Sequence, residues 1–145
     1  MNTNVKNWSL PIVAYLLLLG CSKASELPVM QTADYIIEGN IYSAETLEPV
    51  ENIKVEMYEV TQNASDVERD LFFSSQQGYY RLKHHSSNPY YSSTYKLVFK
   101  DTDGEENVLY RDTTINIVMN NEEFLNGSGE YLGECVRRID VYLVQ

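Results

Sequence analysis

After residue 34, apolar and polar side chains alternate along the chain with a period of two. One run places Tyr95, Leu97 and Phe99 on one side, and Lys96, Val98 and Lys100 on the other. Neighbouring side chains of a β-strand point to opposite faces, so a run of this kind buries one face and leaves the other in water. The sequence therefore predicts about seven short strands. They cover residues 35–41, 53–58, 71–75, 79–83, 95–100, 114–119 and 139–143.

Turn residues separate these strands, and no long segment has the period of a helix. The turn signals are Glu48-Pro49, Gln77-Gly78, Asp103-Gly104 and Asn126-Gly127. We expect the strands on either side of Gln77-Gly78 to form a hairpin, and residues 62–70 to form a polar loop. The chain has 145 residues, which suits one domain. Residues 34–145 are therefore predicted to form an all-β, antiparallel β-sandwich.

The first 33 residues are predicted to target and anchor this domain rather than to form part of its fold. An apolar run over residues 10–20 is too short to cross a bilayer and suits a signal peptide of residues 1–20. The run ends in Leu18-Leu19-Gly20-Cys21, which resembles the bacterial lipobox. This resemblance implies cleavage after Gly20 and acylation of Cys21, with residues 21–33 as a lipidated tether. The alternatives are an ordinary secretory signal that contains a cysteine, or a short membrane anchor.

A lipid on Cys21 would place the protein in the cell envelope, on a bacterial membrane, with the domain either periplasmic or surface-exposed. The 11 Lys and Arg against 21 Asp and Glu give a net charge of −10. Nucleic-acid phosphates and anionic lipid headgroups repel such a chain, so the charge argues against nucleic-acid binding and leaves lipid as the contact with the membrane. With Cys21 acylated, Cys135 has no disulfide partner. We interpret Cys135 as a buried structural thiol rather than a reactive one.

Residues 43–55 (SAETLEPVENIKV) resemble the opening of carboxypeptidase-regulatory-like, or transthyretin-like, domains. In that family a strand leads to a turn, a proline-apolar pair, a tight bend and a strand of alternating Val and Ile. Residues 75–80 (SQQGYY) are similar to the family's turn in which a glycine precedes an aromatic residue. Asn52 stands where the family favours Gly, and Asn enters the left-handed backbone region more easily than most residues. The resemblance implies a transthyretin-like β-sandwich.

Residues 100–107 (KDTDGEEN) are similar to an acidic segment of lipoproteins from Bacteroides-type bacteria that are paired with a radical-SAM enzyme. The lipobox, the tether, the sandwich opening and the acidic segment follow one another in that family's order over residues 18–119. The resemblance implies a lipid-anchored envelope protein, and a radical-SAM enzyme as one partner. It implies no activity, because none is established for the family.

The same acidic segment contains the candidate for a metal site. Asp101, Asp103 and Glu105 alternate along it, and clustered oxygens are what Ca²⁺ selects. A calcium loop needs roughly six to eight oxygens, and the segment offers about half of them. We interpret the segment as a solvated turn at Asp103-Gly104, with calcium binding as the weaker alternative. We expect no metal and no cofactor.

His84-His85 is the only histidine pair of the sequence. Adjacent residues of a strand point to opposite faces, so the two imidazoles do not share a zinc ion. No motif marks a catalytic nucleophile, and we expect no catalytic residue and no enzyme activity. A hydrolase is the weakest alternative, and it requires a deep pocket that holds His84 or His85 with an acidic partner.

Tyrosines gather around Ser86-Ser87-Asn88-Pro89. Rigid amphipathic rings beside Ser and Asn are typical of surfaces that bind proteins or carbohydrates. We therefore name Tyr90, Tyr91 and Tyr95 as candidate binding residues, with coverage of the core as the equal alternative. The leading hypothesis is a lipid-anchored, non-enzymatic envelope protein with a binding or structural role toward a protein or a glycan. The alternative is that the protein is a substrate, modified by a partner radical-SAM enzyme.

Overall fold

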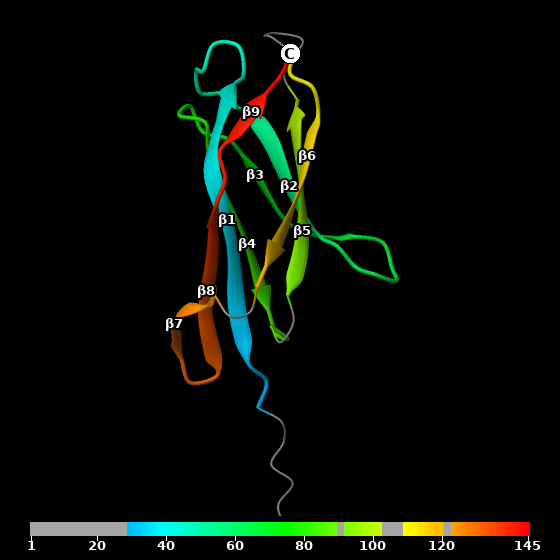
Figure 1. Ribbon diagram of the computed structural model, residues 1–145, viewed down its shortest axis with the longest axis vertical. Coiled ribbons are helices and arrows are strands. Elements are labelled where there is room, and N and C mark those ends of the chain that lie inside the picture. Colours follow the sequence, from blue (N-terminus) through cyan, green and yellow to red (C-terminus); the bar gives the residue numbers. More distant parts are fainter. Residues whose placement is uncertain (1–28, 90–91, 103–108, 121–122) are drawn as a thin grey trace, which may run out of the picture.

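In the computed structural model, the described residues are 29–89, 92–102, 109–120 and 123–145. They form nine strands (Figure 1). The strands are β1 Thr32–Ser43, β2 Ile53–Glu59, β3 Val67–Phe73, β4 Tyr79–Ser86, β5 Ser93–Asp101, β6 Thr113–Met119, β7 Leu125–Ser128, β8 Tyr131–Arg138 and β9 Val141–Leu143. These residues contain no helix long and apolar enough to span a bilayer. The predicted signal peptide and Cys21 lie outside the described residues.

The strands form two sheets that lie face to face (Figure 1). The β1 sheet has the order β4-β1-β8-β7, with β9 paired to β1 beyond the end of β8, and the β2 sheet has the order β3-β2-β5-β6. The predicted all-β antiparallel sandwich is therefore confirmed. Two pairings differ from the antiparallel pattern, because β8 and β9 both run parallel to β1. The described strands also exceed the expected seven, since the sequence reasoning missed β7 and β8.

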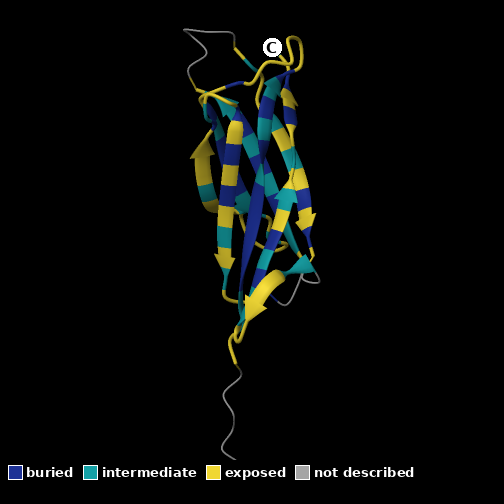
Figure 2. Ribbon diagram, turned by 90° about the vertical axis from the view of Figure 1, so that its left-hand side faces the viewer, coloured by how far each residue is buried: buried dark blue, intermediate teal, exposed yellow. Residues whose placement is uncertain are grey.

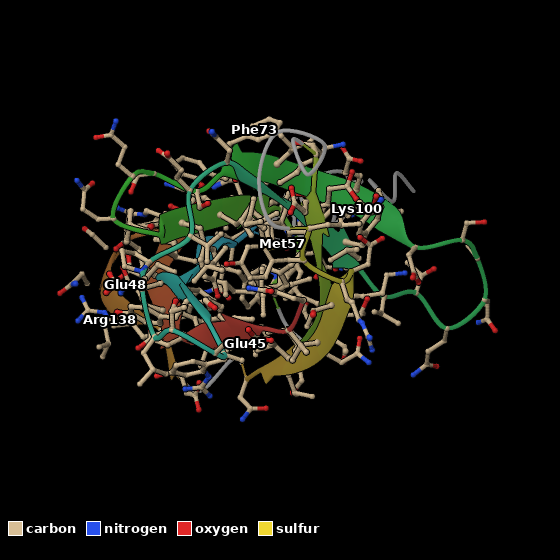
Figure 3. The ribbon with its side chains drawn as sticks, turned by 90° about the horizontal axis from the view of Figure 1, so that it is seen from above. Glu45, Glu48, Met57, Phe73, Lys100 and Arg138 are labelled. Atoms are coloured by element: carbon tan, nitrogen blue, oxygen red, sulfur yellow. The ribbon has the colours of Figure 1, made fainter. Side chains whose placement is uncertain are left out.

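The core lies between the two sheets and follows the predicted alternation, which Figure 2 shows as buried and exposed bands along the strands. Met57 lies near the middle of the molecule when it is seen from above (Figure 3). Apolar surface removed from water, at about 25 cal/mol per Å², is the main stabilising term of such a core. The buried side chains include Tyr35, Ile37 and Ile41 from β1, Ile53, Val55 and Met57 from β2, and Tyr95, Leu97 and Phe99 from β5.

Two of the bends that use the left-handed backbone region lie in the segments that carry the sequence resemblance. Asn52, just before β2, has a φ of 62°, at the position where the resemblance implies a Gly-like bend. Gly78, just before β4, has a φ of 73°, and its N–H donates to the carbonyl of Ser75 (2.8 Å). The turn predicted at Gln77-Gly78 is therefore confirmed.

The strands on either side of this turn do not form the predicted hairpin. β3 pairs with β2, whereas β4 pairs with β1 in the other sheet. Ser74 holds the end of β3 in the β2 sheet, because its Oγ donates to the carbonyl of Val50 and accepts the N–H of Ile53 (both 2.9 Å). The turn therefore carries the chain from one sheet to the other. A turn signal specifies that the chain reverses, not which sheet the next strand joins.

Two predicted connections also differ from the structure. β3 begins at Val67, inside the segment 62–70 that was expected to be a loop, and this edge strand is exposed on both faces. Its side chains therefore lack the alternation by which a strand is recognised. The reversal expected at Asn126-Gly127 lies instead at Gly129-Glu130. Asn126 has a left-handed backbone (φ 63°), but as an irregularity within β7.

Candidate functional site

The outer face of the β1 sheet carries two clusters of charged side chains and a groove. The alternation on β1 directs Asp34 and Glu38 outward, between the side chains of β4 and β8. The register then decides which groups meet, because Asp34 lies opposite His85, and Glu38 lies opposite both Arg81 and Arg138. Cross-strand neighbours on one face of a sheet are close enough to pair.

Asp34 is the buried centre of the first cluster, near the start of β1. Its carboxylate accepts hydrogen bonds from the Tyr131 hydroxyl (2.7 Å) and the Lys83 ammonium (2.9 Å), and Nδ1 of His85 lies 2.8 Å away. Burial acts to raise the pKa of Asp34, but the hydrogen bonds of Lys83, Tyr131 and His85 outweigh it and hold the pKa at about 2. Burial, together with the Asp34 carboxylate, raises the pKa of Tyr131 to about 12. The ionised Asp34 thus ties β1 to side chains of β4 and β8.

We expect this carboxylate to make the stability of the fold depend on pH at the acid end. The pKa of Asp34 lies below its ordinary value of 3.8, so its contribution is complete above about pH 4 and is lost as the pH falls towards about 2. Asp34→Asn should lower the free energy of unfolding by roughly 2 kcal/mol at pH 7 and by much less at pH 2.5. Urea denaturation of both proteins at both pH values measures this difference. An equal difference at the two pH values would contradict the prediction.

Glu38 is the centre of the second cluster, further along β1. Its carboxylate accepts hydrogen bonds from Nε of Arg138 (2.8 Å) and from the hydroxyl of Tyr79 (3.1 Å), and lies 3.9 Å from Nε of Arg81. Burial acts to raise the pKa of Glu38, but the bond from Arg138 and the other partners prevail and lower it. The cluster therefore keeps an ionised carboxylate at the surface and fixes the Tyr79 hydroxyl to it.

The strand pairing is interrupted between β8 and β9, at Ile139 and Asp140, beside Glu38 on the same face. We call this interruption the β8–β9 break. The last predicted strand, residues 139–143, begins only at Val141, because Ile139 and Asp140 leave the regular ladder. The N–H of Asn40 donates to Oδ1 of Asp140 (2.9 Å) rather than to a backbone carbonyl. The carbonyl of Ile139 points at Gly39, where a Cβ would lie 1.9 Å from it. The missing side chain of Gly39 makes this break possible.

The break opens a polar groove on the outer face of the β1 sheet, with a volume of about 570 Å³. Tyr79 at this groove is 37% exposed. Beyond the groove on the same face, the rings of Tyr42 and Tyr142 are stacked, with their centroids 5.5 Å apart. The groove is lined by Glu38, Gly39, Asn40, Tyr79, Arg138 and Asp140.

His84 and His85 point to opposite sides of β4, as the sequence predicts. His85 faces outward to Asp34, whereas Nδ1 of His84 lies 2.7 Å from the hydroxyl of Tyr95, between the sheets. Burial raises the pKa of Tyr95, so its hydroxyl stays protonated, and burial lowers the pKa of His84. Nδ1 of His84 and the Tyr95 hydroxyl therefore share a hydrogen bond between two neutral groups, and the tautomer of His84 decides which of them donates.

A smaller cleft of about 330 Å³ lies at the end of β4. Both histidines line it, and His85 has Asp34 as an acidic partner. The Ser86 hydroxyl oxygen in this cleft accepts the N–H of Asn88 (3.2 Å), a local turn bond. The hydrolase alternative stays a prediction from the sequence. The cleft is lined by Glu59, Arg69, His84, His85, Ser86, Ser87 and Asn88.

The prediction that Tyr95 belongs to a contact surface is wrong. Its ring is fully buried between the sheets against Tyr35, and its hydroxyl is bound to His84. Tyr95 takes an inward position of β5, so the alternation that predicts the strand also assigns this ring to the core. The other two candidates, Tyr90 and Tyr91, lie outside the described residues.

The acidic segment is described only at its start. Oδ2 of Asp101 accepts the N–H of Tyr110 (2.9 Å), which ties the end of β5 to the residues that precede β6. Asp103 and Glu105 lie outside the described residues. Within the part of the chain that the structure describes, no group of three or more His, Cys, Asp or Glu is placed to hold a metal ion.

Cys135 is buried on β8, in agreement with its interpretation as a structural thiol. Its Sγ lies 3.6 Å from a carboxylate oxygen of Glu123. Burial, with the nearby Glu123 charge, raises the pKa of Cys135 to about 11. The thiolate is the nucleophilic form, so this environment keeps Cys135 unreactive at neutral pH.

The sequence reasoning missed the groove on the β1 sheet. Its residues come from β1, from the start of β4 and from the β8–β9 break, and no spacing along the chain marks them as neighbours. The available signal was the outward position of Glu38 and Asn40 in a strand whose other face is apolar. That signal locates an exposed strand face but not the partners across it.

No protein-family model matches the chain, and no curated protein is similar to it in sequence. The chain is similar in structure to 5-hydroxyisourate hydrolase of Klebsiella pneumoniae, with 13% identity and a TM-score of 0.42 over 73% of this chain and 90% of the hydrolase. It is also similar to an (S)-allantoin synthase, with 11% identity and a TM-score of 0.46 over 90% of this chain and 46% of the synthase. Likenesses at this identity concern the fold alone.

Proposed function

We propose that the chain is a lipid-anchored cell-envelope protein whose β-sandwich has a non-enzymatic binding role. The observation that carries the anchor is the run Leu18-Leu19-Gly20-Cys21, followed after a short polar segment by β1 at Thr32. The ten residues between Cys21 and Thr32 reach at most about 35 Å, at about 3.5 Å per extended residue. A lipid on Cys21 would therefore hold the sandwich close to the bilayer.

The direction of β1 supports a binding role for the outer face of the β1 sheet. The strand begins at one end of the molecule, and the C-terminus lies at the opposite end (Figure 1). Asp34 lies near the tethered end, and Glu38, Asn40 and Tyr42 follow in order away from it. An anchor at the start of the domain thus leaves the groove on the side of the sandwich, further from the membrane than the Asp34 cluster.

Substitution of Cys21 tests the anchor. We expect the wild-type protein to fractionate with membranes and to incorporate an alkyne-labelled fatty acid, and Cys21→Ser to lose the label because the acylated thiol is gone. Cys135→Ala is the matched control, since it removes the other cysteine and should keep both properties. Equal membrane retention and equal labelling of wild type and Cys21→Ser would show that lipidation is wrong.

The alternative role, as the substrate of a partner radical-SAM enzyme, is supported by the sequence resemblance of residues 100–107 and by the order of segments over residues 18–119. Most of that acidic segment lies outside the described residues. The groove on the β1 sheet favours the binding role, because it offers a preformed polar surface with an exposed tyrosine. The substrate role does not require such a surface.

A further inference from the structure

We propose that the groove beside the β8–β9 break binds a pyranose unit of a glycan chain, and that the stacked rings of Tyr42 and Tyr142 extend the site. This inference rests on the proposed binding role and names its ligand class. A pyranose ring has an apolar face of C–H groups and a rim of hydroxyls. Such a ligand needs an exposed aromatic surface beside a few fixed polar groups, and the groove provides both.

Tyr79 provides the aromatic surface within the groove. Tyr79 is 37% exposed, while its hydroxyl donates to the Glu38 carboxylate (3.1 Å). Arg138 on β8 holds Glu38 from the side opposite to Tyr79. The ring of Tyr79 is therefore positioned before any ligand binds. A side chain that is already ordered loses little conformational entropy on binding, which favours affinity.

Asp140 and Arg138 provide the polar groups. Within the described residues, both hydrogen bonds of Asp140 go to its Oδ1, from the backbone and side chain of Asn40, so Oδ2 remains an acceptor. Arg138 binds Glu38 through Nε, and its side chain is 82% exposed, so its terminal N–H groups remain donors. A donor and an anionic acceptor beside one another match neighbouring sugar hydroxyls, each of which both donates and accepts.

Tyr42 and Tyr142 lie where a chain of sugars would continue. Tyr42 is two residues beyond Asn40 on β1, about 7 Å along the strand, and points to the same face. Its partner Tyr142 on β9 is 54% exposed. A ligand with several rings in a row can therefore contact Tyr79 and this ring pair on one face.

The charges around the groove favour a neutral polyhydroxylated ligand over a charged one. Glu38 and Asp140 carry two negative charges, and Arg81 and Arg138 carry two positive ones, so the four groups balance. A groove without net charge gives neither an anion nor a cation an electrostatic advantage. An apolar peptide segment is also disfavoured, because the groove is lined mainly by polar side chains that such a segment would leave without hydrogen bonds.

Affinity electrophoresis tests the proposal with the full-length protein in a nonionic detergent. Native gels that contain xylan, mannan, laminarin, starch or galactan are compared with a gel that contains no polysaccharide. We expect at least one polysaccharide to retard the wild type. Tyr79→Ala should weaken the apparent affinity roughly tenfold or more, and Tyr79→Phe should retain most of it, because it keeps the ring.

Phe73→Ala is the matched control for the loss of an exposed ring. Phe73 is 49% exposed on β3 of the other sheet, and Figure 3 shows it on a different side of the molecule from Arg138. This variant should bind like the wild type. Failure of every polysaccharide to retard the wild type, or equal retardation of wild type and Tyr79→Ala, would overturn the proposal.

Circular dichroism and the urea midpoint establish that Tyr79→Ala is folded. If it is not, Asp140→Asn replaces it, because an amide keeps the oxygen that accepts the Asn40 N–H and removes the charge. Retardation of Asp140→Asn should then be weaker than that of the wild type, and unchanged retardation would count against the site. All these variants retain Cys21, so membrane fractionation and fatty-acid labelling report on the anchor separately from glycan binding.

Discussion

Gly39→Ala is expected to lower the free energy of unfolding by roughly 3 kcal/mol or more. A Cβ at residue 39 would lie 1.9 Å from the carbonyl oxygen of Ile139 and 2.6 Å from its carbon, both of them backbone atoms. That carbonyl cannot simply turn away, because it accepts the hydroxyl of the buried Tyr80 (2.8 Å). The N–H of Ile139 donates to the carbonyl of Glu38 (2.9 Å), which fixes the segment from the other side. Urea denaturation followed by circular dichroism measures the loss.

Gly129→Ala is the matched control for this substitution. Gly129 has a φ of 61°, so an added Cβ is strained by the backbone, but no atom lies within 4 Å of that Cβ. We therefore expect a loss of about 1 kcal/mol, the usual penalty of a left-handed residue that is not glycine. Equal losses for the two variants would show that the contact with the Ile139 backbone is not what excludes a side chain at residue 39.

The two-sheet sandwich could be predicted from the sequence because its central strands are buried on one face. Ile53, Val55 and Met57 on β2 and Tyr95, Leu97 and Phe99 on β5 alternate with side chains that are mostly polar, and the structure buries all six. The edge and interrupted strands could not be predicted in the same way. β3 is exposed on both faces, and β8 is interrupted at Gly133, whose backbone φ of 111° departs from that of a regular strand.

The groove could not be predicted because it depends on pairings between distant residues. Asn40 and Asp140 are 100 positions apart, and their contact arises from the parallel pairing of β1 with β8 and β9. A period of two identifies strands and their faces, but it says nothing about which strands are neighbours. The same limit explains the incorrect hairpin, since the turn signal between β3 and β4 carried no information about which sheet each strand joins.

Tyr95→Ala is expected to lower the free energy of unfolding by roughly 3 to 5 kcal/mol, the range for removal of a buried aromatic ring. The ring of Tyr95 packs against Tyr35 with centroids 5.5 Å apart and meets His84 edge-on at 5.8 Å. Its removal leaves a cavity between the sheets and leaves Nδ1 of His84 without its hydrogen-bond partner. Urea denaturation at pH 7, where burial keeps His84 neutral, measures the effect.

Tyr95→Phe separates the two contributions, because it keeps the ring and removes only the hydroxyl. We expect a loss of about 1 kcal/mol, the usual net value of one hydrogen bond. Tyr79→Ala, at a ring that is partly exposed, should stay within about 1 kcal/mol of the wild type. If Tyr95→Ala were as mild as Tyr79→Ala, the ring of Tyr95 would belong to the surface. If Tyr95→Phe were as damaging as Tyr95→Ala, the hydrogen bond to His84 rather than packing would be the main contribution of this residue.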